Sequence, residues 1–399
     1  MRAVVIGAGV VGVACAHYLR RAGASVVLLD QGRVGGGCSH ANCGYVCPSH
    51  VLPLAGPHVL LPTLRTLLQR NSPLAIRLSA GPSLWAWLLR FAWRCRRSDM
   101  LAAGHAIQAL LVSSRSLYDG LALDADWQSQ GLLFVFHSRK ALDHYAHTDA
   151  LLRREFGLGA TRHGPSIDPA LRDDVAGAYR YATDAQVRPD RLMASWKARL
   201  LADGVEIREG VAFQRFTRRS AVTDQGDVPG DVFVVATGAW TPQLSAALHH
   251  HIPVQPGKGY SVTMARPALC PRFPMIFEEH RVAVSPFSDA CRLGSTMEFA
   301  GYDERLDRSR LRLLHDAAKL YLRTPPDGPP MEEWWGWRPM IPDGKPAIGF
   351  LPKRRNVIVA AGHGMLGLSM APATGKLVAE LALGEVPHLD PAPYSVTRF

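Results

Sequence analysis

The glycines nearest the N-terminus have the spacing of a phosphate-binding turn. Gly7, Gly9 and Gly12 follow a short apolar run that resembles a buried strand, and a helical pattern comes directly after them. The first glycine of such a turn permits a tight bend, the second lets backbone approach a pyrophosphate, and the third lets helix and strand pack closely. Asp30 ends the next predicted strand and is suited to accept hydrogen bonds from a ribose 2′-hydroxyl. These residues predict a dinucleotide site that excludes a 2′-phosphate.

A second fragment favours FAD over NAD as that dinucleotide. Residues 232–238 read as an apolar strand that ends in Ala-Thr-Gly, with Trp240 two residues further on. An early glycine turn combined with such a fragment is typical of flavoproteins whose FAD lies extended across the domain. No His or Lys site of the kind that activates the substrate of a nicotinamide dehydrogenase is evident.

One arginine stands in a motif that suits the capture of an acidic group. Arg338 lies in the run Gly336-Trp337-Arg338-Pro339. A guanidinium can hold a carboxylate through two parallel hydrogen bonds, which fixes the orientation of the bound molecule. A structural arginine is the alternative, since only seven of the 45 basic residues are lysines.

The loop after the second strand is rich in sulfur and nitrogen. It contains Cys38, His40, Cys43 and Cys47, and His50 follows. This spacing matches no common zinc site and no fourth ligand is paired with it, so we predict no metal site.

The elements that must hold these residues alternate between strands and helices. Strands are predicted at 3–6, 25–29, 131–136, 175–181, 205–208, 232–235, 260–264, 282–285, 291–296 and 356–361. Helices are predicted at 13–22, 60–118, 188–202, 307–321 and from the 362–367 turn to about 383. We predict an α/β chain in which a Rossmann-like dinucleotide domain (1–58, 184–250 and 335–399) is interleaved with an α+β mixed-sheet substrate domain (59–183 and 251–334).

Composition indicates the compartment and the kinds of partner to expect. The 399 residues carry a net charge of +11, with 47% hydrophobic residues and seven cysteines. An odd number of cysteines without a recognisable signal peptide predicts free thiols in the cytoplasm. The arginines are scattered rather than gathered into a block, which argues against nucleic acid as a partner. The exception is 84–97, where tryptophans precede several arginines: either a core helix with a basic end, or a helix that contacts the cytoplasmic face of the inner membrane.

Five stretches together resemble the D-amino-acid oxidase-like family of FAD enzymes, and within it most closely the bacterial D-amino-acid dehydrogenases. They are VVIGAGVVGVACAHYLRRAG, SHANCGYVCPSHVLPLAGP, IPVQPGKGYSVTM, VAVSPFSDACRLGSTMEFAGYD, and WWGWRPMIPDGKPAIG with AAGHGMLGLSMAPATGKL.

The resemblance implies an oxidative deamination. A hydride passes from Cα of a D-amino acid to flavin N5, the imine hydrolyses to a 2-oxo acid and ammonia, and a quinone or the respiratory chain takes the electrons. Two alternatives stay open: dehydrogenation of a cyclic imino acid such as D-proline or hydroxyproline, and an oxygen-using oxidase. Relatives with a tyrosine on the 282–286 strand differ from this chain, which reads Val-Ala-Val-Ser-Pro there.

The resemblance also assigns residues. Arg338 would pair with the substrate carboxylate, with Tyr260 and His50 as further pocket residues. No cysteine is near the 362–367 turn, so we expect non-covalent FAD, and His363 is expected to belong to that turn rather than to act as a base. The expected FAD contacts are Gly7, Gly9, Val10, Val11, Gly12, Asp30, Gln31, Ser39, Asn42, Cys43, Gly44, Tyr45, Val211, Thr237, Gly238, Trp240, Arg338, Gly362, His363, Gly364, Met365, Leu366 and Gly367.

Overall fold

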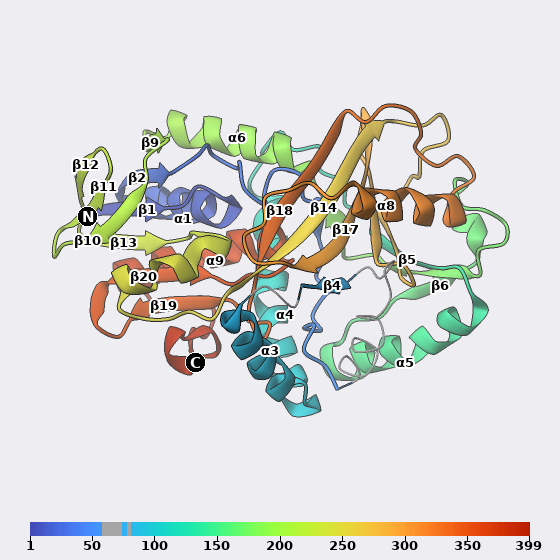
Figure 1. The fold of residues 1–399 in the computed structure, drawn as a ribbon, viewed down its shortest axis with the longest axis horizontal. Helices are drawn as coiled ribbons and strands as arrows, with labels where there is room; N and C mark the ends of the chain where they lie inside the picture. The colour runs from blue at the N-terminus through green and yellow to red at the C-terminus, as the bar shows by residue number, and fades with distance from the viewer. Residues whose placement is uncertain (58–73, 78–80) are drawn as a thin grey trace.

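The computed structural model describes residues 1–57, 74–77 and 81–399, and two sheets organise this part of the chain (Figure 1). A six-stranded sheet lies on the left of the view and a nine-stranded sheet on the right. Each sheet collects strands from distant parts of the chain, so the polypeptide passes between them repeatedly.

The six-stranded sheet is parallel except at one edge. Its order is β19-β20-β13-β1-β2-β9, and only β19 runs antiparallel to its neighbour. The inner strands are continuous apolar runs because helices and loops cover both faces of the sheet. The bounds are β1 Arg2–Ile6, β2 Ser25–Asp30, β9 Glu206–Glu209, β13 Val232–Val235, β19 Ala347–Leu351 and β20 Arg354–Ala361.

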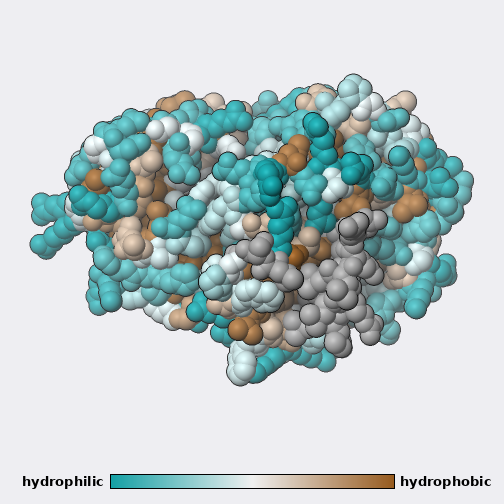
Figure 2. All heavy atoms as spheres, in the orientation of Figure 1, coloured by the Kyte–Doolittle hydropathy of each residue, from teal (hydrophilic) through white to brown (hydrophobic). Residues whose placement is uncertain are grey.

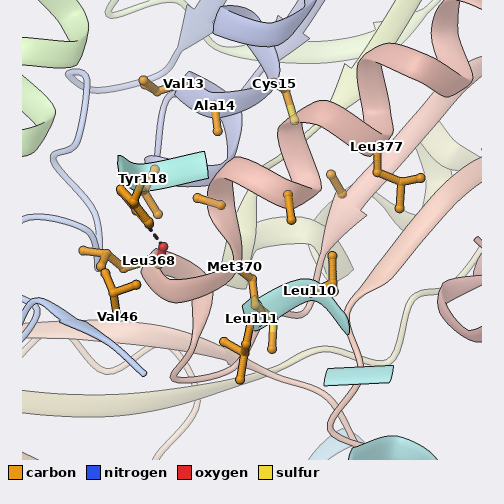
Figure 3. Close-up of a cluster of buried hydrophobic side chains, with 14 of the residues drawn as sticks. Val13, Ala14, Cys15, Val46, Leu110, Leu111, Tyr118, Leu368, Met370 and Leu377 are labelled. Carbon is orange, nitrogen blue, oxygen red and sulfur yellow. Dashed lines mark hydrogen bonds between the residues drawn. The ribbon is translucent and has the colours of Figure 1, made fainter. Parts of the chain in front are cut away.

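Helices α1 (Val10–Arg21) and α9 (Gly367–Leu383) pack closely against each other. A Cβ on Gly375 would lie 2.6 Å from the backbone of Ala14, so only glycine permits this approach. The longest helix, α4 (Arg97–Asp119), packs on α9 (Figure 3). The Tyr118 hydroxyl donates a 2.8 Å hydrogen bond to the Leu368 carbonyl. Although α4 belongs to the expected substrate segment, its side chains thus join the core around the dinucleotide helices.

The nine-stranded sheet is mixed. Its order is β18-β14-β17-β16-β15-β5-β7-β6, with β4 paired in parallel to β17. Helix α8 (Arg308–Tyr321) covers one face through a core that includes Leu314 and Tyr260. The strand bounds are β4 Leu74–Ile76, β5 Leu132–Phe136, β6 Thr161–His163, β7 Gly177–Tyr181, β14 Gln255–Ala265, β15 Met275–Phe277, β16 Val282–Pro286, β17 Ala290–Phe299 and β18 Glu332–Met340.

Smaller elements complete the described part. The remaining helices are α3 Pro82–Arg94, α5 Arg139–Phe156, α6 Pro189–Ala202 and α7 Ser245–Leu248, with short 3₁₀ turns at Pro165–Ile167, Gly238–Leu244, Ala392–Tyr394 and Val396–Arg398. The remaining strands are the meander β10 Phe213–Phe216, β11 Ser220–Thr223 and β12 Gly226–Pro229, and the pair β3 Tyr45–Val46 and β8 Ala185–Gln186.

The predicted fold class is confirmed, and one predicted element is wrong in part. The helix expected over 60–118 lies partly outside the described residues, at 58–73 and 78–80; α3 and α4 account for most of the rest. Leu74–Ile76, however, is strand β4, because its backbone pairs with the edge of β17 in the register Leu74 to Met297. Tertiary pairing here outweighs the local pattern.

The expected division into two interleaved domains stays a prediction. Strand β18 starts before the expected boundary at 334/335 and continues across it within the nine-stranded sheet.

Candidate active site

The glycine turn between β1 and α1 is closed by the chain on one side and open on the other. A Cβ on Gly12 would overlap the carbonyl oxygen of Gly7, and a Cβ on Gly7, whose φ is +101°, would lie 2.5 Å from the carbonyl oxygen of Ala236. Gly9 differs, because its Cβ would meet only the Ser39 hydroxyl, at 3.5 Å. The fold itself therefore requires two of the three glycines, while the third leaves room for a ligand.

The N-terminus of α1 is suited to an anion. Its N-cap residue, Gly9, contributes no side-chain cap, and no acidic residue lies in the first turn. The Val10 N–H donates to the Ser39 hydroxyl at 3.0 Å, which ties the 38–47 loop to this helix end. A helix N-terminus without a cap from its own N-cap side chain, beside an open Gly9, fits the pyrophosphate of a dinucleotide.

Asp30 is fixed beside that turn by backbone groups. One carboxylate oxygen accepts from the Ala8 N–H and the other from the Gly32 N–H, both at 2.7 Å. Burial raises the pKa of the carboxyl group, and the two hydrogen bonds oppose this effect. Its carbonyl accepts from the Val211 N–H at 2.8 Å, so three of the expected contact positions, Asp30, the neighbouring Gln31 and Val211, lie together.

The 38–47 loop is fastened to the nine-stranded sheet. The Asn42 carbonyl accepts from Arg292 at 2.8 Å, and the Cys43 carbonyl accepts from the Ser285 hydroxyl at 2.6 Å. The Tyr45 hydroxyl lies 2.8 Å from the carbonyls of both Met275 and Val284. These contacts place expected FAD residues of the loop between the two sheets.

Arg338 is half-buried on β18 without a counter-charge. Its Nη1 donates to the Thr296 carbonyl at 3.0 Å, and its guanidinium fills the space above Gly259. Within residues 1–57, 74–77 and 81–399 no carboxylate forms an ion pair with it. Burial lowers the pKa of Arg338, an effect that the nearby Cys43 and Cys38 thiols oppose. A bound carboxylate would supply the missing charge.

The turn that opens α9 lies against the same strand. The Gly364 N–H donates to the Pro339 carbonyl at 3.0 Å, directly next to Arg338. His363 is buried, its Nε2 lies 3.0 Å from the Thr374 hydroxyl, and burial lowers its pKa to about 3. A neutral, buried His363 agrees with its expected place in the turn. Helix α9 has no acidic residue in its first turn and no side-chain cap. The other expected members of this turn, Gly362, Met365, Leu366 and Gly367, continue the same chain segment.

The third expected cofactor segment, from Thr237 and Gly238 to Trp240, lies between the two sheets. The Trp240 ring would be 3.6 Å from a Cβ on Gly37 and meets Trp337 edge-on, with centroids 5.4 Å apart. Because Trp337 precedes Arg338, the segment lies beside the strand that carries the arginine.

Tyr260 is not brought together with Arg338. Its side chain is buried in the core under α8, and its hydroxyl donates to the Glu298 carboxylate at 2.7 Å. Arg338 covers the neighbouring residue, Gly259, and successive residues of a strand face opposite sides. The placement therefore argues against the predicted pocket role of Tyr260.

His50 packs in a different environment from Arg338. Its ring lies 5.2 Å from that of Phe134, and burial lowers its pKa to about 4. One ligand atom each from His50, Cys47 and Asp184 lie within 4.8 Å of one another, but the Asp184 carboxylate already accepts from the Ser49 N–H and hydroxyl. No contact in the described part of the chain joins His50 to Arg338.

Sequence reasoning missed three residues that position this site. Thr296 supplies the carbonyl that holds Arg338, while Arg292 and Ser285 hold the 38–47 loop. In all three contacts the acceptor is a backbone carbonyl, of Thr296, Asn42 or Cys43, so residue type alone carried no signal for them. Thr296 follows a backbone irregularity at Ser295, whose φ is +112°.

Comparison with known proteins identifies the family of the chain. The model of a family described as FAD-dependent oxidoreductase matches residues 2–381. A D-amino acid dehydrogenase of Xanthobacter autotrophicus is 33% identical across 100% of this chain and 99% of its own. One of Paramagnetospirillum magneticum is 32% identical, again with 100% and 99% covered.

Solved structures share the fold. Glycine oxidase of Geobacillus kaustophilus superposes with a TM-score of 0.80 and 22% identity, covering 100% of this chain and 99% of that one. L-proline dehydrogenase of P. horikoshii has a TM-score of 0.72 and 20% identity, covering 100% and 97%.

The fold and the site define a flavin-dependent oxidoreductase. The chain belongs to the DAO family of FAD-dependent oxidoreductases, and an amino acid dehydrogenase or oxidase type of activity follows from that membership. None of the helices in the described ranges is long and apolar enough to cross a membrane.

Proposed function

We propose that this protein oxidises free D-amino acids to 2-oxo acids and ammonia, with non-covalently bound FAD, and passes the electrons to a quinone. The observation that carries the proposal is Arg338, a half-buried guanidinium that lacks a carboxylate partner in the described chain and lies against the α9 turn. The D-amino acid dehydrogenases that match along the whole chain support the choice of substrate.

Arg338 would bind the substrate carboxylate and so fix which face of Cα meets the ring. Its Nη1 is held by the Thr296 carbonyl, which orients the guanidinium, and no other acceptor among the described residues engages its side-chain N–H groups. Holding the substrate in one orientation converts binding energy into rate, because the reacting atoms need not search for their geometry.

Bound FAD would supply the hydride acceptor. The residues that suit it are the glycine turn, Asp30, the 38–47 loop, the Thr237 segment and the α9 turn. The N-terminus of α9 has no acidic residue in its first turn, so its backbone N–H groups would favour negative charge on the reduced ring. His363 is neutral above a pH of about 3 and hydrogen-bonded to Thr374, so we assign it no proton transfer.

Anaerobic reduction of the purified protein tests the proposal. We expect a flavin spectrum that bleaches on addition of D-amino acids but not of their L-enantiomers, and denaturation should release the flavin into solution. A protein without flavin, or one that bleaches only with L-amino acids, would contradict it. D-proline and hydroxyproline belong in the same screen, because the 282–286 strand lacks a tyrosine and leaves the cyclic alternative open.

The electron acceptor is tested on the reduced protein. Reoxidation should be fast with a soluble quinone analogue and slow with air. The reverse order would make the protein an oxidase instead.

A further inference from the structure

Helix α3 exposes an apolar stripe on the surface. Trp85, Leu89 and Trp93, spaced four residues apart, are 47%, 73% and 66% exposed. Residues at i, i+4 and i+8 lie on one face of a helix, so the three side chains form a continuous row. Figure 2 shows apolar side chains among hydrophilic ones at the lower edge of the molecule, where Figure 1 places α3.

The opposite face of α3 already has its partners. Leu84 and Trp87 are buried in a cluster with Met297, Phe299 and Met340. The Trp87 ring N–H donates to the Pro253 carbonyl at 3.1 Å. The helix is therefore held in place by its inner face, and Trp85, Leu89 and Trp93 take no part in this cluster of described residues. Exposed apolar side chains that gather in this way mark surfaces of interaction.

The C-terminal half of the stripe is basic. Arg90, Arg94, Arg96 and Arg97 accompany it, against one acid, Asp99. Arg94 and Arg97 form only long ion pairs, with N–O distances of 4.0 Å to Asp99 and 3.8 Å to Glu155. Arg96 stacks on Trp93, and no carboxylate in the described ranges pairs with Arg90 or Arg96. The stripe thus offers tryptophan and leucine for insertion together with unneutralised positive charge.

We propose that α3 docks this protein on an anionic lipid bilayer, with Trp85, Leu89 and Trp93 in the interface and the arginines at the headgroups. This combination of apolar face, tryptophan and flanking arginine is the chemistry of a helix that lies in the membrane surface. A second copy of the chain fits less well, because a two-fold axis through the stripe would bring like charges together.

Docking here would place the bilayer close to the active site. The inner face of α3 contacts Met340, two residues after Arg338, and Met297, which follows Thr296. A lipid-soluble electron acceptor would then arrive at the same end of the nine-stranded sheet as the substrate anchor. This consequence depends on the proposed function, but the docking itself does not.

Vesicle flotation of the holoenzyme tests the proposal. We expect co-flotation with vesicles of phosphatidylcholine and phosphatidylglycerol at low ionic strength, much weaker binding in high salt, and little binding to phosphatidylcholine alone. Replacing both Trp85→Ser and Trp93→Ser should reduce the bound fraction at least about tenfold. The matched control is Val386→Ser, which changes a side chain that is 91% exposed elsewhere and should leave binding unchanged.

A second pair of variants isolates the charge. Arg90→Glu with Arg96→Glu should abolish binding to the anionic vesicles, whereas Arg139→Glu with Arg312→Glu, exposed positions on α5 and α8, should not. All variants should keep their flavin and its reduction by substrate, which separates this test from that of the proposed function. Equal flotation of the Trp85 and Trp93 variant and the wild type would overturn the proposal. So would a wild type that ignores vesicles but self-associates in a manner that depends on these tryptophans.

Discussion

At the scale of single residues, the predicted substrate ligands Arg338 and Tyr260, on neighbouring strands, lie on opposite faces of the nine-stranded sheet. Arg338 and Gly259 share one face of the sheet, while Tyr260 faces the core under α8. The sequence indicates a strand at 260–264 but not which of its faces meets the ligand, because both faces of β14 are buried. Arg338 was predicted as a ligand from its motif. The Thr296 carbonyl that holds Arg338 was not predicted, since a contact made by a backbone carbonyl does not depend on residue type.

Replacing Arg338→Ala should raise KM by about 100-fold, because a substrate carboxylate loses a charge-assisted hydrogen-bond pair worth about 2–3 kcal/mol. Arg338→Lys keeps the positive charge but loses the two parallel N–H donors of the guanidinium, so its KM should lie between those of the alanine variant and the wild type. Steady-state kinetics with a quinone analogue measures this. Added guanidinium should partly rescue the alanine variant, which a purely structural role would not allow, and Arg308→Ala, an exposed position, serves as control. An unchanged KM would remove Arg338 from the site.

At the scale of elements, the sequence predicted those strands and helices that have a local pattern of apolar residues and turn residues. The turn around Gly7 and helix α1 follow from glycine spacing and apolar periodicity. Strand β4 does not, because three residues form a strand there only through their pairing with β17, more than two hundred positions away. The fastening of the 38–47 loop by Arg292 and Ser285 has the same long-range origin.

The open side of the glycine turn gives a prediction with a close control. Gly9 and Gly164 share an extended backbone, with φ of −68° and −74° and ψ of 177° in both. Gly9→Ala should therefore leave the melting temperature of the apoprotein unchanged. It should lower the affinity for FAD at least about tenfold, since the methyl group stands where the backbone must approach the pyrophosphate. Gly164→Ala should change neither. Flavin titration and thermal melts measure both quantities, and full FAD affinity in Gly9→Ala would refute the placement.

At the scale of the whole molecule, buried histidines set the response to acid. Burial lowers the pKa of His17 and His50 to about 4 and that of His363 to about 3, from 6.5 in an exposed side chain. A histidine that is neutral when folded contributes its full stability above pH 6.5 and loses it as the pH falls toward the folded value. Between pH 7 and 5, each of these three histidines would lower the free energy of unfolding by about 2 kcal/mol.

Asp184 acts in the opposite direction. Burial raises its pKa from 3.8 to about 7, so the folded protein gains stability from this group as the pH falls. Between pH 7 and 5, Asp184 adds about 2 kcal/mol to the free energy of unfolding. This gain is smaller than the combined loss from the three histidines, so the protein still becomes less stable. Urea titrations at pH 7 and 5 should show this loss of unfolding free energy in the wild type. The loss should be larger in Asp184→Asn, and it should equal that of the wild type in His144→Gln, a control at an exposed position. A smaller loss in Asp184→Asn would contradict the argument.

The fold class and the order of most elements could be predicted because they rest on local periodicity. The expected boundary at 334/335 stays a prediction; strand β18 crosses it and carries the first residues of the expected 335–399 segment into the nine-stranded sheet. Residues 97–119 likewise read as a helix, but only packing on α9 shows that they complete the core around the dinucleotide turn.

The order of strands in the six-stranded sheet has a consequence for synthesis on the ribosome. Strand β1 needs β13, which leaves the ribosome more than two hundred residues later, and β13 in turn needs β20, which ends at Ala361. Because the chain emerges from its N-terminus, the sheet that surrounds the glycine turn stays incomplete until β20 has emerged. The nascent chain therefore leaves β1 and β2 without the rest of their sheet until residue 361 is made, and the proposed FAD site can be complete only after that point.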